Sequence, residues 1–296
     1  MRRLPALKSG WMLVAGFSFA VMGLFVKLGA PDFSPAELVF YRSFFGLIPL
    51  ALFAFRQRQP VTTIHWRLHL VRSVSGLISL WLYFFALTQL PLATAVTLNY
   101  TSPLFLALLM TVLSREKLHR PLLLTLVFGF MGIVLVLRPH LGPDQWFAGL
   151  LGLLSGFGAG VAYLNVRAMG ELGEPEWRIV LYFTALSTIV LGVYLLFVPR
   201  HPLTWGNVWV LLALGGAATI GQLTMTRAYR TGSTWLVANF AYSAIVFSSF
   251  LGILFFREWL SWSGWLGVVI VIMAGISASR QVRRRRVPVR PTEVCS

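Results

Sequence analysis

The sequence contains little cysteine and little negative charge. A single cysteine, Cys295, stands next to last among 296 residues, which leaves no disulfide and no cysteine metal site. Only 11% of the residues are charged and nine are acidic, whereas 57% are hydrophobic. A soluble domain usually carries about a quarter of its residues as charges. The composition therefore excludes a water-soluble globule, and 26 Gly and 11 Trp are typical of a helical membrane protein with several spans.

Ten apolar segments of membrane-spanning length fill the chain. A helix needs roughly 20 mostly apolar residues to cross the hydrocarbon core. Charges, prolines and polar clusters divide the sequence into predicted spans at 10–29, 35–55, 67–87, 92–113, 121–137, 147–168, 178–198, 207–227, 234–256 and 262–280. Ten of the 11 Trp residues lie near span ends, as in an interfacial aromatic belt, and only Trp81 lies in the middle of a span.

The positive charges predict the orientation of these spans. Cytoplasmic connections are enriched in Lys and Arg. With the N-terminus inside, 19 of the 25 Lys and Arg residues lie on the cytoplasmic side, four lie outside, and Arg42 and Arg72 lie within spans. Both termini are thus predicted in the cytoplasm, with residues 281–296 as a basic tail. The net charge of +16 then reflects topology, and no nucleic-acid partner is predicted.

The two halves of the chain resemble each other. A shift of 142 residues aligns Tyr100 with Tyr242 and the pair Arg115-Glu116 with Arg257-Glu258, and Lys27 and Arg167 end the first span of each half. Each half, at 10–137 and 147–280, holds five spans, so the second half crosses the membrane upside down relative to the first. Inverted repeats are the architecture of many secondary transporters, and this fold-level analogy predicts a transporter.

Several short motifs resemble one family. The second span opens with Ser34-Pro35-Ala36-Glu37-Leu38 and continues to Tyr41-Arg42-Ser43, and Leu90-Pro91-Leu92-Ala93 leads into a span with Thr101-Ser102-Pro103-Leu104. Together with Arg-Glu after spans four and nine, these motifs resemble the EamA branch of the drug/metabolite transporter superfamily, from about residue 10 to 280. The resemblance implies an inner-membrane carrier of small metabolites. Its members handle amino acids, nucleotide-derived cofactors, riboflavin and drugs.

Polar residues in the middle of spans are candidate substrate ligands, because they are costly in lipid and tend to face a cavity or another helix. Spans four and nine carry the first set, Thr97, Asn99, Tyr100, Asn239, Tyr242 and Ser243, and Pro103 frees a backbone carbonyl in the same turn of span four. A second set, in spans that the resemblance places around a central cavity, is Trp81, Tyr83, Tyr163, Asn165 and Gln222. Helix–helix packing is the alternative role for each.

Charged residues within the spans are few. Glu37 and Arg42 lie about 140° apart on one helix, so each is expected to find a partner on another helix or to reach the interface. A structural or gating role is favoured for both. Arg72 is expected to extend its side chain to the cytoplasmic interface. His65 and His69 share a helix face without a third ligand, so no metal site is predicted.

These patterns lead to one functional prediction. All nine carboxylates are assignable to span ends, connections or the tail, which predicts no mid-membrane proton relay. The spans hold neither a catalytic cluster nor a phosphate-binding loop, so we expect no enzyme, no cofactor and no direct use of ATP. We predict an all-α, ten-span carrier in a bacterial inner membrane that moves a small metabolite, an amino acid or a related compound, outward by alternating access. Uptake or exchange of riboflavin or S-adenosylmethionine is the alternative, with an integral-membrane enzyme as a remote one; lipid is an expected partner, and a homodimer is left open.

Overall fold

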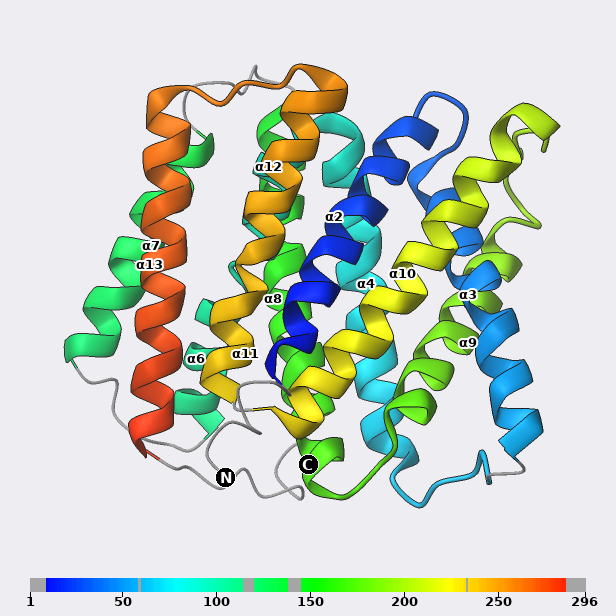
Figure 1. Cartoon of the computed structure of the whole chain (residues 1–296), viewed down its shortest axis with the longest axis horizontal. Coiled ribbons are helices and arrows are strands. Elements are labelled where there is room, and N and C mark those ends of the chain that lie inside the picture. Colours follow the sequence, from blue (N-terminus) through cyan, green and yellow to red (C-terminus); the bar gives the residue numbers. More distant parts are fainter. Residues whose placement is uncertain (1–8, 58–59, 114–119, 138–144, 233, 286–296) are drawn as a thin grey trace.

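The secondary structure is helical throughout the described part of the chain. The computed structural model describes residues 9–57, 60–113, 120–137, 145–232 and 234–285 (Figure 1). The helices are α2 (Trp11–Gly29), α3 (Pro35–Gln57), α4 (Trp66–Gln89), α5 (Leu92–Asn99), α6 (Ser102–Leu113), α7 (Arg120–Leu137), α8 (Gln145–Glu171), α9 (Glu176–Tyr194), α10 (Trp205–Thr231), α11 (Thr234–Ala241), α12 (Ser243–Phe256) and α13 (Trp262–Arg285).

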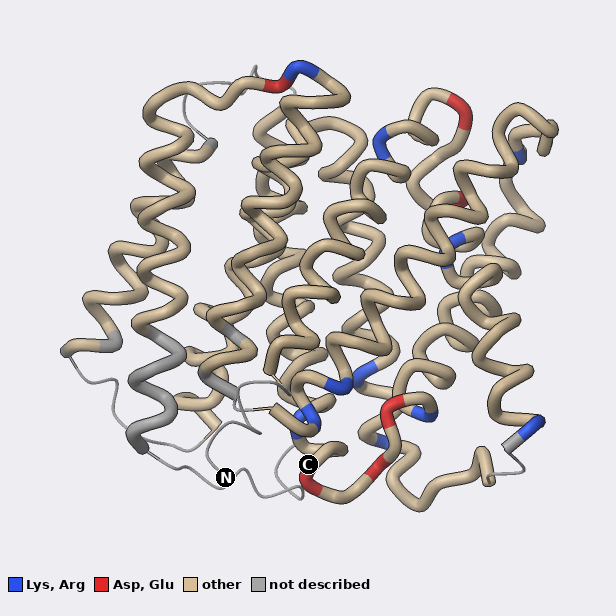
Figure 2. The backbone as a smooth tube through the Cα atoms, in the orientation of Figure 1, with Lys and Arg blue, Asp and Glu red and all other residues tan. Residues whose placement is uncertain are grey.

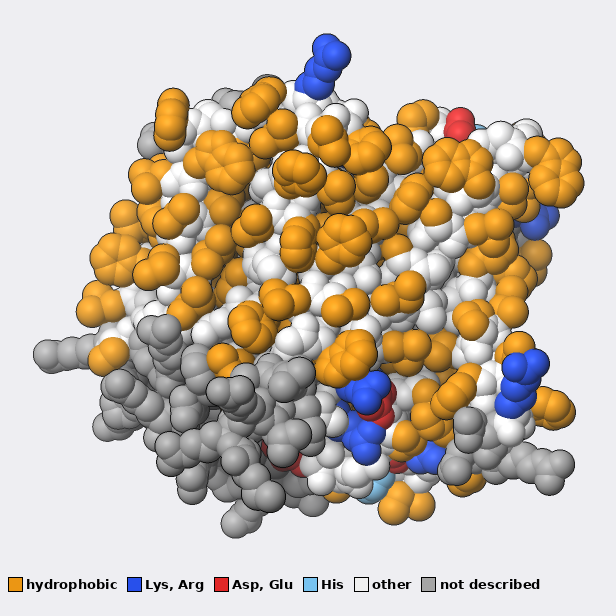
Figure 3. Space-filling view, viewed as in Figure 1, with side chains coloured by type: hydrophobic (Ala, Val, Ile, Leu, Met, Phe, Trp, Pro, Cys, Tyr) orange, Lys and Arg blue, Asp and Glu red, His pale blue; other side chains and the backbone are white. Residues whose placement is uncertain are grey.

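These helices confirm the predicted ten-span, all-α membrane fold. Eight helical stretches are long and apolar enough to cross a membrane, and α7 and α13 contain shorter apolar stretches at Leu123–Val136 and Trp262–Ser277. Figure 3 shows apolar side chains covering the visible outer surface between two edges that carry the charges. A surface of this kind suits contact with lipid rather than water. The predicted boundaries hold to within five residues, the largest shift being the continuation of α13 to Arg285.

The ten spans alternate in direction, so that α2 begins and α13 ends at the same face, which we call the terminal face (Figure 1). Helix ends at this face carry Arg56, Arg67, Arg167, Arg178, Arg227 and Arg230, whereas Lys27, Arg200 and Arg257 lie at the opposite face (Figure 2). By the positive-inside rule, this charge bias agrees with the predicted cytoplasmic position of the terminal face. The placement of the termini in the cytoplasm stays a prediction.

The two halves interlock as inverted repeats. The first helix of each half packs against the third helix of the other: α2 against α10, and α8 against α4. The second helices, α3 and α9, pack together at one side of the molecule, and the fifth helices, α7 and α13, pack together at the other (Figure 1). Exchanging the two halves turns the α2–α10 contact into the α8–α4 contact, and it leaves the α3–α9 and α7–α13 contacts unchanged. The centre of the molecule is therefore built from both halves.

Spans four and nine are broken, which corrects the prediction of continuous helices over 92–113 and 234–256. Helix α5 ends at Asn99 and α6 begins at Ser102, while α11 and α12 are separated at Tyr242. Pro103 contributes to the first break, because it has no N–H to donate to the carbonyl one turn earlier. The Thr101 hydroxyl donates to the carbonyl of Leu98 at 2.7 Å. The same carbonyl accepts the backbone N–H of Thr101 at 3.2 Å, so it stays bonded although the helix is interrupted, as a membrane interior requires.

Glycine at equivalent positions lets each break approach the other half. A Cβ on Gly156 in α8 would overlap the Thr101 hydroxyl and come within 2.7 Å of the Leu98 carbonyl oxygen. A Cβ on Gly16 in α2 would lie 2.6 Å from the Ser243 hydroxyl at the second break. Gly16 and Gly156 are related by the same shift of 140 residues as Lys27 and Arg167. The contact of α2 with the break in span nine is therefore the repeat equivalent of the contact of α8 with the break in span four.

Glu258 connects the halves at the opposite face. Helix α12 ends with Arg257 in the left-handed conformation, and the N–H of Glu258 donates to the carbonyl of Gly252. This turn, of the type that commonly ends helices, directs the Glu258 carboxylate to the first half. There it pairs with Lys27 and accepts the N–H of Leu92 at 2.8 Å, at the start of α5. A carboxylate at a helix N-terminus is favourable because it satisfies a free N–H and meets the positive end of the helix dipole.

We expect Gly156→Ala to destabilise the protein, because the added methyl group meets backbone at the first break. The cost of overpacking is about 1–3 kcal/mol, which lowers Tm by roughly 2–12 °C. Gly216→Ala in α10 is the matched control, since a Cβ there meets nothing within 4 Å. Thermal unfolding of the detergent-purified proteins measures both. Equal melting temperatures for the two variants would show that the break does not need the close approach of α8.

Candidate functional site

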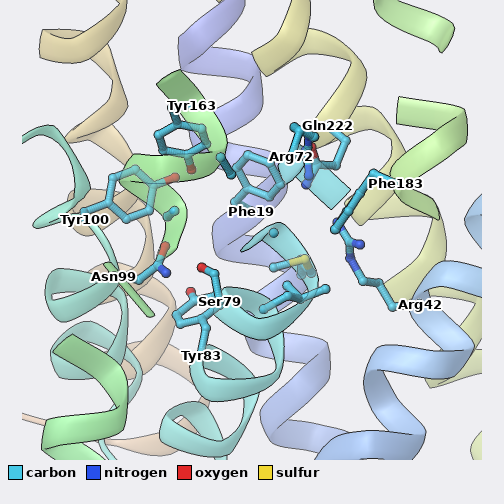
Figure 4. A pocket seen from close by; sticks show the side chains of 15 residues that line it. Phe19, Arg42, Arg72, Ser79, Tyr83, Asn99, Tyr100, Tyr163, Phe183 and Gln222 are labelled. Atoms are coloured by element: carbon cyan, nitrogen blue, oxygen red, sulfur yellow. The ribbon is translucent and has the colours of Figure 1, made fainter. Parts of the chain in front are cut away.

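A small cavity lies at the centre of the molecule, between the two halves (Figure 4). Its volume is about 60 Å³, and its walls come from α2, α3, α4, the α5–α6 break, α8, α9 and α10. The lining residues are Phe19, Met22, Arg42, Arg72, Gly76, Ser79, Leu80, Tyr83, Asn99, Tyr100, Ala159, Ala162, Tyr163, Phe183 and Gln222. All of them except Tyr100 lie within helices, so the site is held by rigid elements.

One end of the cavity, the tyrosine end, is formed by Tyr83, Asn99, Tyr100 and Tyr163 (Figure 4). Tyr100 occupies the break in span four and is almost completely buried. Tyr163 on α8 stacks on Tyr229 with ring centroids 5.3 Å apart. This end presents aromatic rings, phenol hydroxyls and one amide, a combination suited to a ligand with both apolar and hydrogen-bonding parts.

A hydrogen-bonded network positions Asn99. The Asn99 side-chain amide donates to the Ser155 hydroxyl of α8 at 3.0 Å, and that hydroxyl donates to the carbonyl of Gly152 at 2.5 Å. Ser79 of α4 donates to the Ser155 carbonyl at 2.7 Å. Three helices are thereby joined beside the break. Fully bonded polar groups of this kind hold a side chain in one orientation.

The other end, the arginine end, is formed by Arg42, Arg72, Phe183 and Gln222 (Figure 4). Both guanidinium groups approach the Phe183 ring, with Cζ of Arg72 at 4.1 Å and Cζ of Arg42 at 5.3 Å from the centroid. Arg72 Nη2 also donates to Gln222 Oε1 at 3.4 Å. Arg42 and Arg72 belong to the first half and Phe183 and Gln222 to the second. The arginine end is therefore an interface between the halves.

The two arginines have no acidic partner among the described residues. Their exposed fractions are 3% and 2%, and no described carboxylate forms an ion pair with either. The Nε atoms of both side chains are buried without a hydrogen-bond partner in the described structure. An unpaired charge costs several kcal/mol in such an environment. Contact with Phe183 offsets only part of that cost, because a desolvated cation–π contact contributes about 2 kcal/mol.

Five of the eleven predicted ligands line this cavity: Tyr83, Asn99, Tyr100, Tyr163 and Gln222. Trp81 is 39% exposed and packs edge-on against Tyr194, away from the cavity lining. The Thr97 hydroxyl and the Asn165 amide donate to backbone carbonyls of their own helices, at 2.7 and 2.9 Å. Asn239, Tyr242 and Ser243 lie at or beside the second break and outside the cavity wall, and Pro103 begins α6.

Tyr100 and Tyr242 occupy equivalent positions but have different surroundings. The hydroxyl of Tyr242 fills the space that a Cβ on Gly275 of α13 would occupy. The shift of 142 residues places buried Ile133 of α7 where α13 has Gly275. The first half therefore lacks the space that receives Tyr242, and Tyr100 lines the cavity instead.

Arg72 corrects another sequence-based prediction, that its side chain extends to the cytoplasmic interface. The guanidinium folds back over its own helix, where a Cβ on Gly76 would collide with Arg72 Nη1 and lie 3.1 Å from the Phe183 ring. Glycine at this position thus makes room for the guanidinium. Phe183, Ser79 and Phe19 also line the cavity without having been singled out from the sequence. Gly76, one turn after an arginine inside a span, is the sequence signal that could have identified Arg72 as a buried side chain.

Glu37 lies in a contact between the halves. It is buried at the start of α3 and accepts the backbone N–H of His201 at 2.8 Å, with His201 Nδ1 at 2.9 Å. His201 belongs to the connection between α9 and α10 of the second half. Arg42, the other residue with a predicted structural or gating role, lines the cavity instead.

The terminal face has an equivalent contact around Glu174. Glu174 precedes α9 and accepts hydrogen bonds from Thr63, in the connection before α4, and from Arg178 Nη1 at 2.8 Å. Burial alone would raise the pKa of the Glu174 carboxyl, but these two hydrogen bonds and the nearby Arg178 charge hold it below its usual value. Glu174 is therefore ionised at neutral pH. Each face thus has one carboxylate that binds a connection from the other half.

Two inverted five-span halves around a central cavity are the architecture of many secondary transporters. The model of the EamA-like transporter family matches residues 8–138 and 146–279, nearly the whole chain. The chain belongs to this family, within the drug/metabolite transporter superfamily. It is a multi-pass secondary transporter of a small molecule and not an enzyme, as predicted.

Its relatives move different solutes. Over 283 residues the chain is 31% identical to the pseudopaline exporter CntI of Pseudomonas aeruginosa, covering 94% of this chain and 98% of that protein. It is 26% identical to a riboflavin transporter of Rhizobium johnstonii, covering 94% and 93%, and 21% identical to an S-adenosylmethionine uptake transporter of Rickettsia bellii, covering 90% of each. A crystal structure with 19% sequence identity matches with a TM-score of 0.61 over 93% of this chain and 99% of that chain, and it shares the fold.

We expect Arg72→Met to raise thermal stability, because it replaces an unpaired buried charge with a flexible, unbranched apolar side chain. The gain is about 1–4 kcal/mol, less the lost contact with Phe183. Arg67→Met is the matched control, since Arg67 is exposed and lies over Trp66 near the helix end. Thermal unfolding in detergent compares the two. A Tm for Arg72→Met below that of Arg67→Met would contradict the view that the Arg72 charge is uncompensated.

Proposed function

We propose that the protein exports a small metabolite, an amino acid or a related compound, across a bacterial inner membrane by alternating access to the central cavity. The position of this cavity is the observation that carries the proposal. It lies between the halves, is lined from both, and touches the break in span four. Broken helices beside a central site are typical of secondary transporters, because a break frees polar groups for a solute.

The contacts between the halves support a rocking motion. Lys27, Glu258 and the Glu37–His201 pair join the halves at the opposite face, and Glu174 with Thr63 joins them at the terminal face. Opening the cavity to one face requires the contacts at that face to separate while the others hold. Separation also enlarges the site, whose 60 Å³ is far below the roughly 300–1,000 Å³ of a cavity that encloses a drug-sized ligand.

Export is supported by the relative at 31% identity, which is named an exporter, and a bacterial inner membrane by relatives from bacteria. The alternative is uptake or exchange of a flavin-like or nucleotide-derived solute. The aromatic rings of the tyrosine end favour this alternative, because they provide flat apolar surfaces for a ring system.

Comparison of solutes in the medium tests the direction. Bacterial cells expressing the protein are expected to release one or a few metabolites faster than cells with an empty vector, and proteoliposomes containing the purified protein should carry the same compounds. Faster loss of riboflavin or S-adenosylmethionine from the medium, without release of any compound, would favour the alternative over export.

The two tyrosines at the helix breaks provide a matched pair of variants. We expect Tyr100→Phe to reduce the rate of release at least several-fold, because the Tyr100 hydroxyl belongs to a side chain in the cavity wall. Tyr242→Phe should keep the wild-type rate, since it removes a hydroxyl that is buried without a hydrogen-bond partner in the described structure. Rates are normalised to the amount of folded protein in the membrane. Equal losses in both variants would overturn the assignment of the cavity as the transport site.

A further inference from the structure

We propose that the transported solute is an organic anion and that Arg42 and Arg72 bind its oxyanion group, a carboxylate or a phosphate. The inference rests on the proposed function, because it assigns the central cavity to the solute. Two positively charged groups converge at one end of this cavity, and the described lining contains no carboxylate. An ionisable residue inside a membrane protein indicates a functional partner of opposite charge.

The arginine end has unused hydrogen-bond donors. A guanidinium has five N–H donors in a planar fork that matches the oxygens of a carboxylate or phosphate. Within the described structure, the one side-chain hydrogen bond of either guanidinium group is the long contact from Arg72 to Gln222, and both Nε atoms lack a partner. An oxyanion bound at this end of the cavity would accept hydrogen bonds from these donors and offset both charges. The binding of an anion would thereby remove the cost of burying them.

Neighbouring residues hold the two guanidinium groups at the same end of the cavity despite their repulsion. Phe183 contacts both of them through its ring. Gly76 leaves the space into which Arg72 folds, and Gln222 accepts a hydrogen bond from it. Preorganisation of this kind is expected of a binding site rather than of a structural ion pair, because no internal counter-charge is supplied.

The tyrosine end limits the rest of the solute. Tyr83, Tyr100, Tyr163 and Asn99 offer rings, hydroxyls and an amide but no negative charge that could receive an ammonium group. The solute therefore carries its anionic group at one end and an uncharged polar or aromatic group at the other, which narrows the proposed class to relatives of amino acids that have no ammonium group. S-adenosylmethionine carries a sulfonium and an ammonium group besides its carboxylate, and the described lining offers no counter-charge for either.

An anionic solute also accounts for export without a proton relay. A membrane potential of 100 mV, negative inside, favours the outward movement of each negative charge by about fifty-fold in concentration. No described carboxylate lies in the middle of a helix: Glu37, Glu174 and Glu258 lie at helix ends. The potential alone can therefore drive release of the anion.

The compounds released by expressing cells test this inference together with its premise. Their charge at pH 7 is measured by ion-exchange fractionation before identification. We expect them to be anions, and their carboxylate or phosphate content distinguishes the two kinds of oxyanion. Release of only neutral or cationic compounds would overturn the anion inference and leave export standing. Release of nothing above the empty vector would overturn both.

A binding assay on the purified protein tests the arginines directly. Benzoate, phenyl phosphate, benzamide and benzylamine share one ring and differ in charge. We expect benzoate or phenyl phosphate at millimolar concentration to raise the Tm of the wild type by at least 2 °C, and benzamide and benzylamine to leave it unchanged. The shift should be lost in Arg42→Gln and Arg72→Gln and kept in Arg67→Gln, whose side chain is exposed near the terminal face. Equal shifts with all four compounds, or a full shift in both cavity variants, would overturn the inference.

Discussion

Backbone N–H and C=O groups inside a bilayer have no water to bind, and this constraint governs the centre of the protein. At the break in span four, the Leu98 carbonyl is bonded by the N–H and the hydroxyl of Thr101, and Gly156 lets α8 approach the broken turn. The break ends α5 where Asn99 and Tyr100 meet the cavity. The broken turn, which α8 of the second half contacts, is therefore also part of the cavity wall.

The charged side chains of the cavity differ from the carboxylates that lie between the halves. Each described carboxylate between the halves is bonded: Glu258 to Lys27, Glu37 to His201 and Glu174 to Thr63 and Arg178. The cavity arginines have no such partner. Proteins tolerate a local loss of stability where function requires it, and the unpaired guanidinium groups match that expectation. The bonded carboxylates thus lie at the two faces, and the unpaired guanidinium groups lie at the central cavity.

Much of the fold could be predicted from sequence, because span length and charge bias act locally and the repeat is visible in pairs such as Arg115-Glu116 and Arg257-Glu258. The site was only partly predictable. Depth in the membrane can be counted along a span, and it identified Tyr83, Tyr163 and Gln222. The direction in which a side chain points depends on neighbouring helices that the sequence does not place. Trp81, two residues from Tyr83, accordingly faces outward, and Phe183 escaped notice because an apolar residue in a span carries no signal of its own.

The sequence by itself determined the family, the ten spans and the inverted relation of the halves, since these follow from composition, segment length and motif order. Only the tertiary structure decided how the two equivalent tyrosines differ. Gly275 of α13 leaves room for Tyr242, whereas Ile133 closes the same position in α7 and leaves Tyr100 in the cavity wall. The tertiary structure likewise brought Arg42 and Arg72 to one ring, that of Phe183. Both outcomes depend on the space between helices that are far apart in the chain, and the local sequence around these residues does not specify that space.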